Sequence, residues 1–410
     1  MSVKVAAAED PVSKSWVAVG EVTKVAETLV VREYEEERDK AAVEAVERLC
    51  EVGQRGRPAL VTDLLGDPVC RIRHFPLHIM LVAEWGEGGE IVGVIRGCIK
   101  SVTRSGSSDY VKAANILGLR VSPTHRRLGI GLKLVQELEE WSKRNGAECA
   151  YMATDSTNGP SISLFTKKCE YMKLRTPTVL VQPVHVHRKP LSSGTAIVRL
   201  PPKLAESIYR RIFAKAEFFP EDIDTVLGNK LNLGTFMAIP KKHLPIWDPK
   251  TSVLPPSFAI LSIWNTKEVF KFQVKGVSRI KKACCLGSRK IDSMLPYLKI
   301  PSFPNVFRQF GIHFLYGLHM EGKDGSTLMK SLCSFAHNMA TDDVACGALV
   351  AEVGLQDPVR AAVPHWRRLS WSEDFWCIKK LGGEGGLSRP HSDWMYQIPA
   401  PVLFVDPRDV

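Results

Sequence analysis

The chain has 410 residues, of which 45% are hydrophobic and 24% are charged, as in folded globular proteins. This length favours two domains, and without an apolar run of about 20 residues we expect no segment that spans a membrane. The net charge is +11, and residues 181–410 hold most of it, with 30 Lys and Arg against 20 Asp and Glu. We therefore expect either a contact surface for an acidic partner in this region or simply a solvated basic face.

Ten cysteines are scattered along the chain. They form no C-x-x-C motif and no spacing typical of metal ligands, and the N-terminus has no signal-peptide pattern. These features predict reduced thiols in the cytoplasm or the nucleus and no metal site.

In chain order, residues 1–26 are aperiodic and predict a flexible extension. A strand over 28–33 precedes a helix, and two apolar strands over 78–85 and 90–102 enclose a Gly-rich turn, which predicts a β-hairpin. The apolar face of the helix is indicated by residues at three- and four-residue spacing, namely Ala42, Val43, Val46, Leu49 and Cys50.

The sequence V-S-P-T-H-R-R-L-G-I-G-L follows the next apolar run, 115–121, and leads into a well-patterned helix. It contains Arg126-x-x-Gly129-x-Gly131. Two glycines let the backbone approach a ligand closely, and the unpaired N–H groups of the first helical turn favour an anion. The loop therefore predicts a phosphate-binding site between a strand and a helix.

The helix behind the loop places Ile130, Leu134, Leu138 and Trp141 on one stripe. A strand over 148–153, a short helix over 161–168 and a β-rich stretch over 178–187 follow. The predicted order of elements is thus β-α-β-β-β-α-β-α-β, which indicates an α/β fold.

Arg126-R-L-Gly129-I-Gly131, together with Asn158-G-P-S-I-S-Leu164-Phe165, resembles the acyl-CoA motifs of the Gcn5-related N-acetyltransferase (GNAT) superfamily. More narrowly, the segments 62–74, 95–100, 164–169 and 404–408 resemble the plant Hookless-type N-acetyltransferases. The resemblance implies an α/β (α+β) fold with a mixed sheet.

The same resemblance implies acetyl-CoA as co-substrate. Backbone N–H groups from Arg127 to Leu132 would hold the pyrophosphate, and the strand that ends at Val121 would pair with the pantetheine arm. The expected cofactor-binding residues are Leu119, Val121, Arg126, Arg127, Leu128, Gly129, Ile130, Gly131, Leu132 and Asn158.

The residues that commonly serve catalysis in the family are absent from their usual positions in this sequence. Phe165 occupies the position of the tyrosine that commonly protonates the leaving thiolate in the family, and residues 115–121 contain no glutamate. Glu84 and Asp155 are the candidates for a general base by their position in the chain, although each is also explained as a surface or turn carboxylate. The general base therefore stays unknown at this level.

After residue 190 the order of predicted elements repeats that of the first half. We expect a GNAT domain over 27–190 and a degenerate GNAT-like domain over 191–410 that serves packing or recognition. Its loop lacks the arginine and the G-x-G spacing, and Asp324 would repel a pyrophosphate. One cluster without an acidic residue predicts an exposed basic loop, or a segment for nuclear import or phosphate contact: Arg279, Lys281, Lys282, Arg289 and Lys290.

The sequence and the resemblance thus predict an acetyl-CoA-dependent N-acetyltransferase that acts on a protein amine, such as a lysine of a nuclear or chromatin protein. The Hookless-type resemblance implies a role in hormone-dependent plant growth, in the nucleus or cytoplasm. Two alternatives remain, a weakly active or inactive acetyl-CoA-binding regulatory module and an acetyltransferase for small-molecule amines. The sequence gives no oligomeric state.

Overall fold

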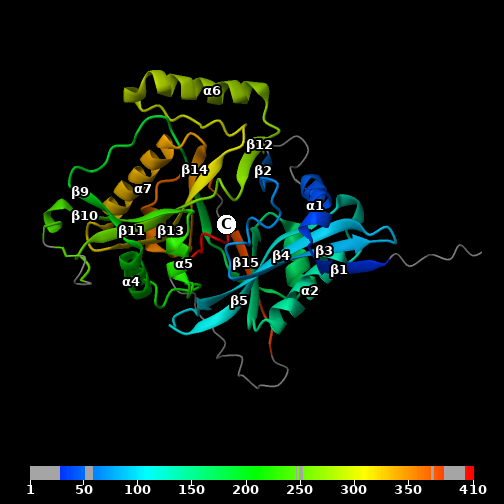
Figure 1. Ribbon diagram of the computed structural model, residues 1–410. Helices are drawn as coiled ribbons and strands as arrows, with labels where there is room; N and C mark the ends of the chain where they lie inside the picture. The colour runs from blue at the N-terminus through cyan, green and yellow to red at the C-terminus, as the bar shows by residue number, and fades with distance from the viewer. Residues whose placement is uncertain (1–27, 51–58, 246, 249–252, 371–373, 383–401) are drawn as a thin grey trace, which may run out of the picture.

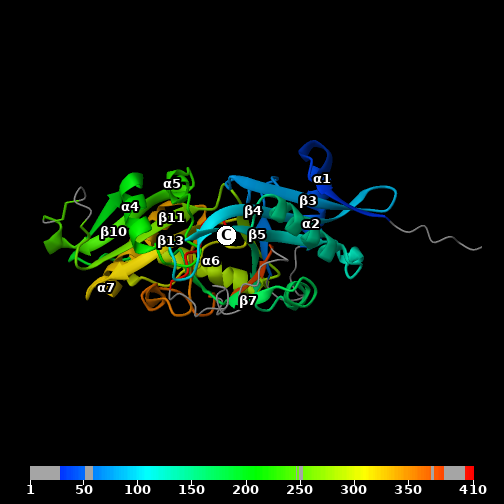
Figure 2. The same cartoon turned by 90° about the horizontal axis from the view of Figure 1, so that it is seen from below.

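Two mixed β-sheets lie side by side in the computed structural model, and helices cover their faces (Figure 1 and Figure 2). The structure describes residues 28–50, 59–245, 247–248, 253–370, 374–382 and 402–410. The extension expected over residues 1–26 lies outside these described residues. Within them, no helix has both the length and the apolar character needed to cross a membrane.

The first sheet has seven strands, and β5 and β6 are its parallel pair. The hairpin predicted from the Gly-rich turn is present as the antiparallel pair β3–β4. In sheet order the strands are β1 (Leu29–Glu33), β3 (Leu77–Trp85), β4 (Glu90–Thr103), β5 (Tyr110–Val121), β6 (Cys149–Asp155), β15 (Asp374–Lys380) and β7 (Met172–Arg175).

Helices α1 (Glu36–Cys50) and α2 (Ile130–Arg144) cover opposite faces of this sheet. As predicted, α2 buries Ile130, Leu134 and Leu138, which pack against the strands around β4 and β5. Three short helices complete the first half: η1 (Pro123–His125), α3 (Gly159–Ser163) and the π-helical turn η2 (Leu164–Lys168).

The second sheet has six strands, with β13 and β14 as its parallel pair. Helix α7 (Gly325–Asp342) covers one face with an apolar stripe, and α4 (Pro202–Ile212) and α5 (Ile223–Gly228) lie toward the first half. In sheet order the strands are β8 (Thr178–Pro183), β14 (Cys346–Val353), β13 (Gly311–Glu321), β11 (Phe258–Asn265), β10 (Asn232–Pro240) and β9 (Thr195–Leu200). The short helices η3 (Lys241–His243), η5 (Pro296–Leu298) and η6 (Pro358–Ala361) lie in the loops.

The two halves repeat one arrangement, a parallel strand pair connected through a long helix. Strands β5 and β6 are joined through α2, as β13 and β14 are joined through α7. Both β5 and β13 contain a bulge with a glycine of positive φ, Gly118 at 63° and Gly317 at 59°. The expected mixed α/β fold with two GNAT-like halves is confirmed.

A single boundary at residue 190 does not separate the two sheets, however. Strand β8, which we expected to complete the first domain, pairs with β14 in the second sheet. Strand β15, from the other end of the chain, is inserted between β6 and β7 of the first sheet. The pattern of apolar residues in a strand does not encode which neighbour it pairs with, so this exchange was not visible in the sequence.

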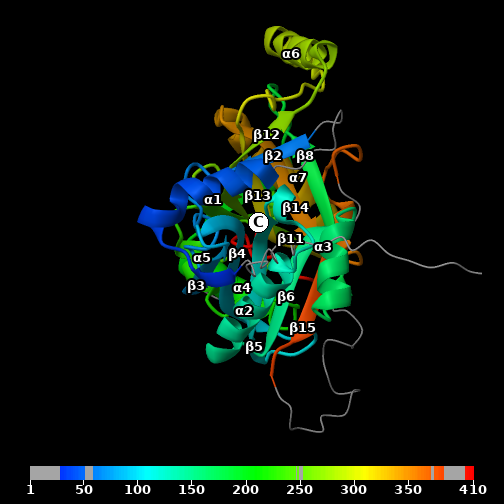
Figure 3. The ribbon, with the colours of Figure 1, turned by 90° about the vertical axis from the view of Figure 1, so that its right-hand side faces the viewer.

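A third connection between the halves is the two-stranded sheet of β2 (Ala59–Asp63) and β12 (Lys271–Lys275). Strand β2 was not predicted from the sequence. Helix α6 (Arg279–Met294) follows β12 and stands apart from both sheets (Figure 1 and Figure 3). The basic cluster predicted as an exposed loop lies on this helix. Ser278 caps the helix by accepting a hydrogen bond from the Lys281 N–H, a signal that could have indicated its start.

Candidate functional site

The phosphate-binding loop predicted from the sequence connects β5 to α2, as expected. Arg127 and Gly129 both have positive φ, at 66° and 86°, and Gly129 is the N-cap of α2. The first intrahelical hydrogen bond runs from the Lys133 N–H to the Gly129 carbonyl. The N–H groups of the preceding turn, including those of Gly131 and Leu132, therefore lie at the positive end of a 15-residue helix.

The two glycines are needed for different reasons. At Gly129 a Cβ would meet nothing within 4 Å, so the requirement comes from its left-handed backbone. At Gly131 a Cβ would lie 3.5 Å from the Leu164 side chain and 3.7 Å from Val121, which are ordinary contacts. The absence of a side chain at Gly131 thus leaves the backbone of the first turn open to a ligand.

The side chains around the loop leave its outer surface positively charged. Arg126 and Arg127 are exposed, and the Arg126 Nε donates to the Val121 carbonyl at 3.4 Å. Leu128 is 51% exposed, between these arginines and Gly129. The exposed guanidinium groups and the helix N-terminus together favour a phosphate or pyrophosphate group.

Strands β5 and β6 separate beside this loop. Their pairing covers four positions and ends at Ile116 and Met152, although β5 continues to Val121 and β6 to Asp155. The stretch of β5 that contains Leu119 and Val121 therefore has no β-strand partner on the β6 side. The Val121 carbonyl accepts hydrogen bonds from Arg126 Nε and from the Cys50 thiol, and the Leu119 carbonyl accepts one from Arg120. No strand occupies this edge, so its backbone can pair with an extended ligand arm as an additional strand would, once these side chains give way.

Asn158 lies at the far side of this opening, at the N-cap of α3. Its Nδ2 donates to the Thr154 hydroxyl at 3.1 Å, and its Oδ1 accepts from the Ser161 N–H at 3.4 Å. The side chain is exposed. The structure thus brings the predicted cofactor-binding residues to two sides of one opening, between β5 and the start of α3.

The two candidate general bases are engaged in other interactions. Glu84 accepts hydrogen bonds from Arg32 at 2.7 Å and from Arg38 at 2.6 Å, in a hollow beside α1. Asp155 accepts from the N–H and the hydroxyl of Thr157, which closes its own turn. In these arrangements both carboxylates are held by local partners.

Phe165, in the position of the family tyrosine, is buried and packs edge-on against Tyr171 with the ring centroids 5.1 Å apart. Burial raises the pKa of the Tyr171 phenol well above its usual value. Neither ring offers a proton donor at the opening.

A largely buried charge network that was not predicted lies beside the β5–β6 pair. The Asp409 carboxylate accepts from Asn115 Nδ2 at 3.0 Å, from the Tyr151 hydroxyl at 3.0 Å and from Lys100 Nζ at 2.7 Å. Burial raises the pKa of Asp409, and the Lys100 charge opposes this rise. Asn115 and Asp409 are 294 positions apart in the chain, so only the fold could bring them together.

Arg408 ties this network to the second half. Its guanidinium binds Asp222 at 2.6 and 2.8 Å and Asp406 at 2.8 Å. The charges of Arg408 and Lys100 hold the pKa of Asp406 well below its usual value, against the opposing effect of burial. The end of the chain is thus buried between the two sheets (Figure 1).

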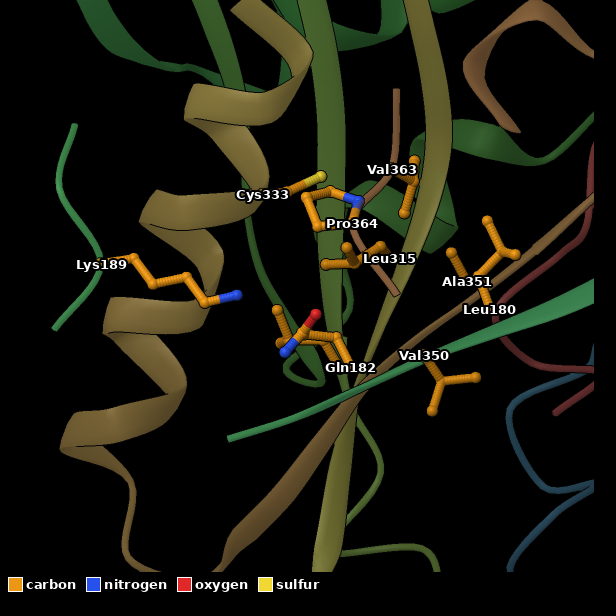
Figure 4. Close-up of a pocket in the computed structure, with 10 residues that line it drawn as sticks. Leu180, Gln182, Lys189, Leu315, Cys333, Val350, Ala351, Val363 and Pro364 are labelled. Carbon is orange, nitrogen blue, oxygen red and sulfur yellow. The ribbon is translucent and has the colours of Figure 1, made fainter. Parts of the chain in front are cut away.

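The corresponding place in the second half is closed. Leu315 and Ala351 form the last pair of β13 and β14, and there a cavity of about 10 Å³ remains, room for about one water molecule. Lys189 points into this space, as Figure 4 shows, and burial lowers the pKa of its ammonium group. The loop before α7 is closed as well, since a Cβ at Gly322 would lie 2.2 Å from the Pro256 carbonyl oxygen.

Among the residues that the structure describes, no group of three or more His, Cys, Asp or Glu side chains could hold a metal ion. The described histidines of the second half, such as His185, His187 and His337, stack on one another or bond to backbone and Asp292.

Comparison with known proteins gives matches at several levels. The family model described as "Acetyltransferase (GNAT) family" matches residues 46–171. "Probable N-acetyltransferase HLS1" of Arabidopsis thaliana is 48% identical over 93% of this chain and 99% of its own length. "Acetyl transferase GW6a" of Oryza sativa subsp. japonica is 41% identical over 95% of this chain and 99% of its own length.

Among solved structures, N-myristoyltransferase of Saccharomyces cerevisiae with bound myristoyl-CoA is similar with a TM-score of 0.52. The match has 10% sequence identity and covers 86% of this chain and 79% of that chain. At this level of identity the likeness concerns the fold, and it extends over both halves.

Proposed function

This chain belongs to the GNAT family of N-acetyltransferases, and on that basis we propose that it transfers the acetyl group of acetyl-CoA to an amine of a protein. The observation that supports the proposal most directly is the opening between β5 and β6, which has the Gly129–Gly131 turn at one end. The second half contains the same elements with the opening filled, which favours one acetyl-CoA site per chain.

Acetyl-CoA fits the residues of the first half. The N–H groups at the start of α2, from Ile130 to Leu132, have no acceptor within the helix, and together with the side chains of Arg126 and Arg127 they would hold its phosphates. The unpaired edge of β5 at Leu119 and Val121 would hold the pantetheine arm, and Asn158 would contact that arm from the other side. When bound, acetyl-CoA supplies an activated acyl group.

The chain's own backbone can stabilise the charge that develops on the acyl oxygen. The bulge at Gly118 interrupts the pairing of β5 with β4 between Leu117 and Arg120, and a backbone N–H of this stretch would donate to the acyl oxygen. An N–H donor that is fixed in place at such a position contributes roughly 10²–10³-fold to the rate in acyl transfer.

A lysine side chain of a nuclear or chromatin protein is the acceptor that we favour. A surface of net positive charge in residues 181–410 supports contact with an acidic assembly such as chromatin. Helix α6 offers such a surface, because Arg279, Lys281 and Lys290 are exposed on it. Action in the nucleus and a role in plant growth are part of the same proposal.

A regulatory module that binds acetyl-CoA without efficient turnover is the second candidate. Two residues favour this candidate. Phe165 has no hydroxyl to protonate the leaving thiolate, and Asn115 on β5 has no carboxylate to act as a general base. Such a module would act through protein–protein contacts alone.

Calorimetry with acetyl-CoA, combined with turnover assays on core histones and on a panel of small amines, separates these functions. We expect binding together with acetylation of protein lysines. Binding without turnover on any acceptor would contradict the enzymatic proposal and favour the regulatory module, and turnover confined to small amines would contradict the protein acceptor.

A further inference from the structure

The face of the first sheet opposite α2 meets the second half at the level where β5 and β6 separate. Because side chains alternate along a strand, Tyr151, Ala153 and Asp155 of β6 share this face. Tyr151 belongs to the apolar core between the halves, and its hydroxyl bonds to Asp409. Ala153 and Asp155 lie beyond the last β5–β6 pair and therefore border the opening.

Strand β15 extends this face. Trp376 is paired with Ala153 and Asp374 with Asp155, so both side chains lie on the side that faces the second half. The Trp376 ring stacks on Tyr151, with centroids 5.6 Å apart and an interplanar angle of 18°. The exchanged strand thus places an indole and a carboxyl group beside the opening.

Glu352 reaches the same place from the second sheet. It lies on β14, and its side chain points away from α7, since its neighbours Ala351 and Val353 pack against that helix. The Glu352 Oε1 accepts a hydrogen bond from Trp376 Nε1 at 2.9 Å. Glu352 is only partly buried. It is therefore a carboxyl group of the second half at the opening of the first.

The cations on this face are committed to other carboxylates. Arg175, which is paired with Trp376 across β15 and β7, binds Glu217 at 2.6 and 2.7 Å. Lys100 binds Asp406 and Asp409. Among the described residues, no lysine or arginine forms an ion pair with Glu352.

This environment favours the protonated form of Glu352 and gives it an affinity for a proton near neutral pH. Burial, followed by the negative charges of Asp374 and Asp409, raises the pKa of Glu352 to about 8, and the Trp376 hydrogen bond opposes this rise. Burial and then Asp155 raise the pKa of Asp374 to about 6. A base with a pKa near the working pH is the most effective for proton transfer.

We propose that Glu352 is the general base of the acetyl transfer, so that the second half supplies the carboxylate that β5 lacks. This inference rests on the proposed function. Its three competitors are less suited: Glu84 is paired with two arginines, Asp155 is bonded to Thr157, and Asp409 accepts from the three donors Lys100, Asn115 and Tyr151.

In the proposed step, a lysine ammonium of the acceptor gives one proton to the Glu352 carboxylate. The freed nitrogen lone pair forms the C–N bond to the acetyl carbon while the C–S bond breaks, and the sulfur takes its electron pair. The second proton of the nitrogen passes to the thiolate. Glu352 then releases its proton to solvent, so that the products are the amide, CoA thiol and one proton.

The first test is Glu352→Gln, which keeps an oxygen acceptor for Trp376 but removes the base. Wild type and variant are compared on core histones with acetyl-CoA. We expect kcat to fall by about 10²–10⁴-fold, with acetyl-CoA affinity in calorimetry and the cooperative thermal transition retained. The matched control is Glu321→Gln, an exposed glutamate on β13, which should act as wild type. A Glu352→Gln enzyme with wild-type kcat would overturn the proposal.

Two further variants test Glu352 through the pH profile of kcat. If Glu352 had only a structural role, these variants would not shift that profile in opposite directions. Asp374→Asn removes a negative charge and should shift the acidic limb of kcat to lower pH, by roughly one unit. Trp376→Phe removes the donor that stabilises the Glu352 anion and should shift that limb to higher pH. Identical profiles in the two variants would contradict the assignment. Asp409, the other charged group that acts on Glu352, is unchanged in both variants, as is Asp155, which acts on Asp374.

The pKa of Glu352 can also be measured directly, without turnover. Glutamate labelled with ¹³C at the carboxyl carbon, compared in wild type and Glu352→Gln, identifies the Glu352 signal, and its titration should have a midpoint near pH 8. A midpoint near the ordinary value of 4.5 would overturn the inference even in an active enzyme. If wild type acetylates no acceptor at all, the proposed function fails and Glu352 loses its catalytic role with it.

Discussion

The two halves keep the same strand–helix–strand unit but differ in the turn that precedes the long helix. Both bulged strands, β5 and β13, contain a glycine of positive φ, and both are followed by a long helix. In the first half the strands then separate beside an exposed, arginine-rich turn. In the second half the turn packs against Pro256, and about 10 Å³ remains beside Leu315. The two halves thus share a backbone arrangement and differ in the side chains around the turn and the parallel strands.

The second half contributes residues to the first half. It contributes β15 to the first sheet, Glu352 to the opening and Asp222 to the buried charge network. Because these contacts involve exchanged strands, neither half has a complete core alone. The comparison therefore predicts that changes between the halves affect stability most, and that changes in the turns affect binding.

The largest expected effect on stability is at Arg408, where the halves are joined. Arg408→Met leaves Asp222 and Asp406 without their main cation, and an unpaired buried charge of this kind costs about 3–5 kcal/mol. Urea denaturation measures the loss. The matched control is Arg188→Met, which breaks an exposed pair with Asp342 and should cost no more than about 1 kcal/mol. Equal losses in the two variants would show that the network does not hold the halves together.

A second prediction concerns the turn of the first half. Gly129→Val forces a β-branched residue into the left-handed region, a strain on the order of 1–3 kcal/mol, and should displace the first turn of α2. We expect acetyl-CoA affinity to fall by roughly tenfold or more, as measured by calorimetry. Gly88→Val, in the exposed turn between β3 and β4 where a Cβ meets nothing, serves as the control. Unchanged affinity in Gly129→Val would remove this turn from the site.

A third prediction concerns the pH dependence of stability at Glu352. Its pKa is raised from 4.5 to about 8 in the folded protein, so the folded state holds more protons than the unfolded state between these values. The free energy of unfolding should therefore decrease as the pH rises through this window. Glu352→Gln should unfold at a higher temperature than wild type at pH 8–9, and the two midpoints should converge below about pH 4.5. A variant that is less stable than wild type at alkaline pH would contradict the burial of this charge.

Local features of the sequence predicted the first half well. The glycines at 129 and 131, the apolar stripe of α2 and the hairpin of β3 and β4 each depend on neighbouring residues, which periodicity and turn chemistry reveal. The binding residues expected from these features border one opening in the structure. The base at that opening was not predicted, because Glu352 reaches it only through a partner strand of the other sheet.

Long-range features account for what was missed. The pairing of β2 with β12 and of β15 with β6 joins segments that are more than 200 positions apart, and nothing in the local pattern specifies such partners. Helix α6 was taken for a loop because its charged residues masked a weak apolar pattern. Asp409 was not singled out in the sequence, because its partners Lys100, Asn115 and Tyr151 are more than 250 positions away along the chain.

The most direct test of the difference between the halves is the stoichiometry of acetyl-CoA binding, measured by calorimetry on the full chain. We predict one site per chain. That site should be lost in Gly131→Leu, which fills the first turn of α2, and kept in Gly325→Ala at the corresponding turn of α7. Two sites per chain, or a single site that survives Gly131→Leu and disappears in Gly325→Ala, would contradict the assignment of the open half.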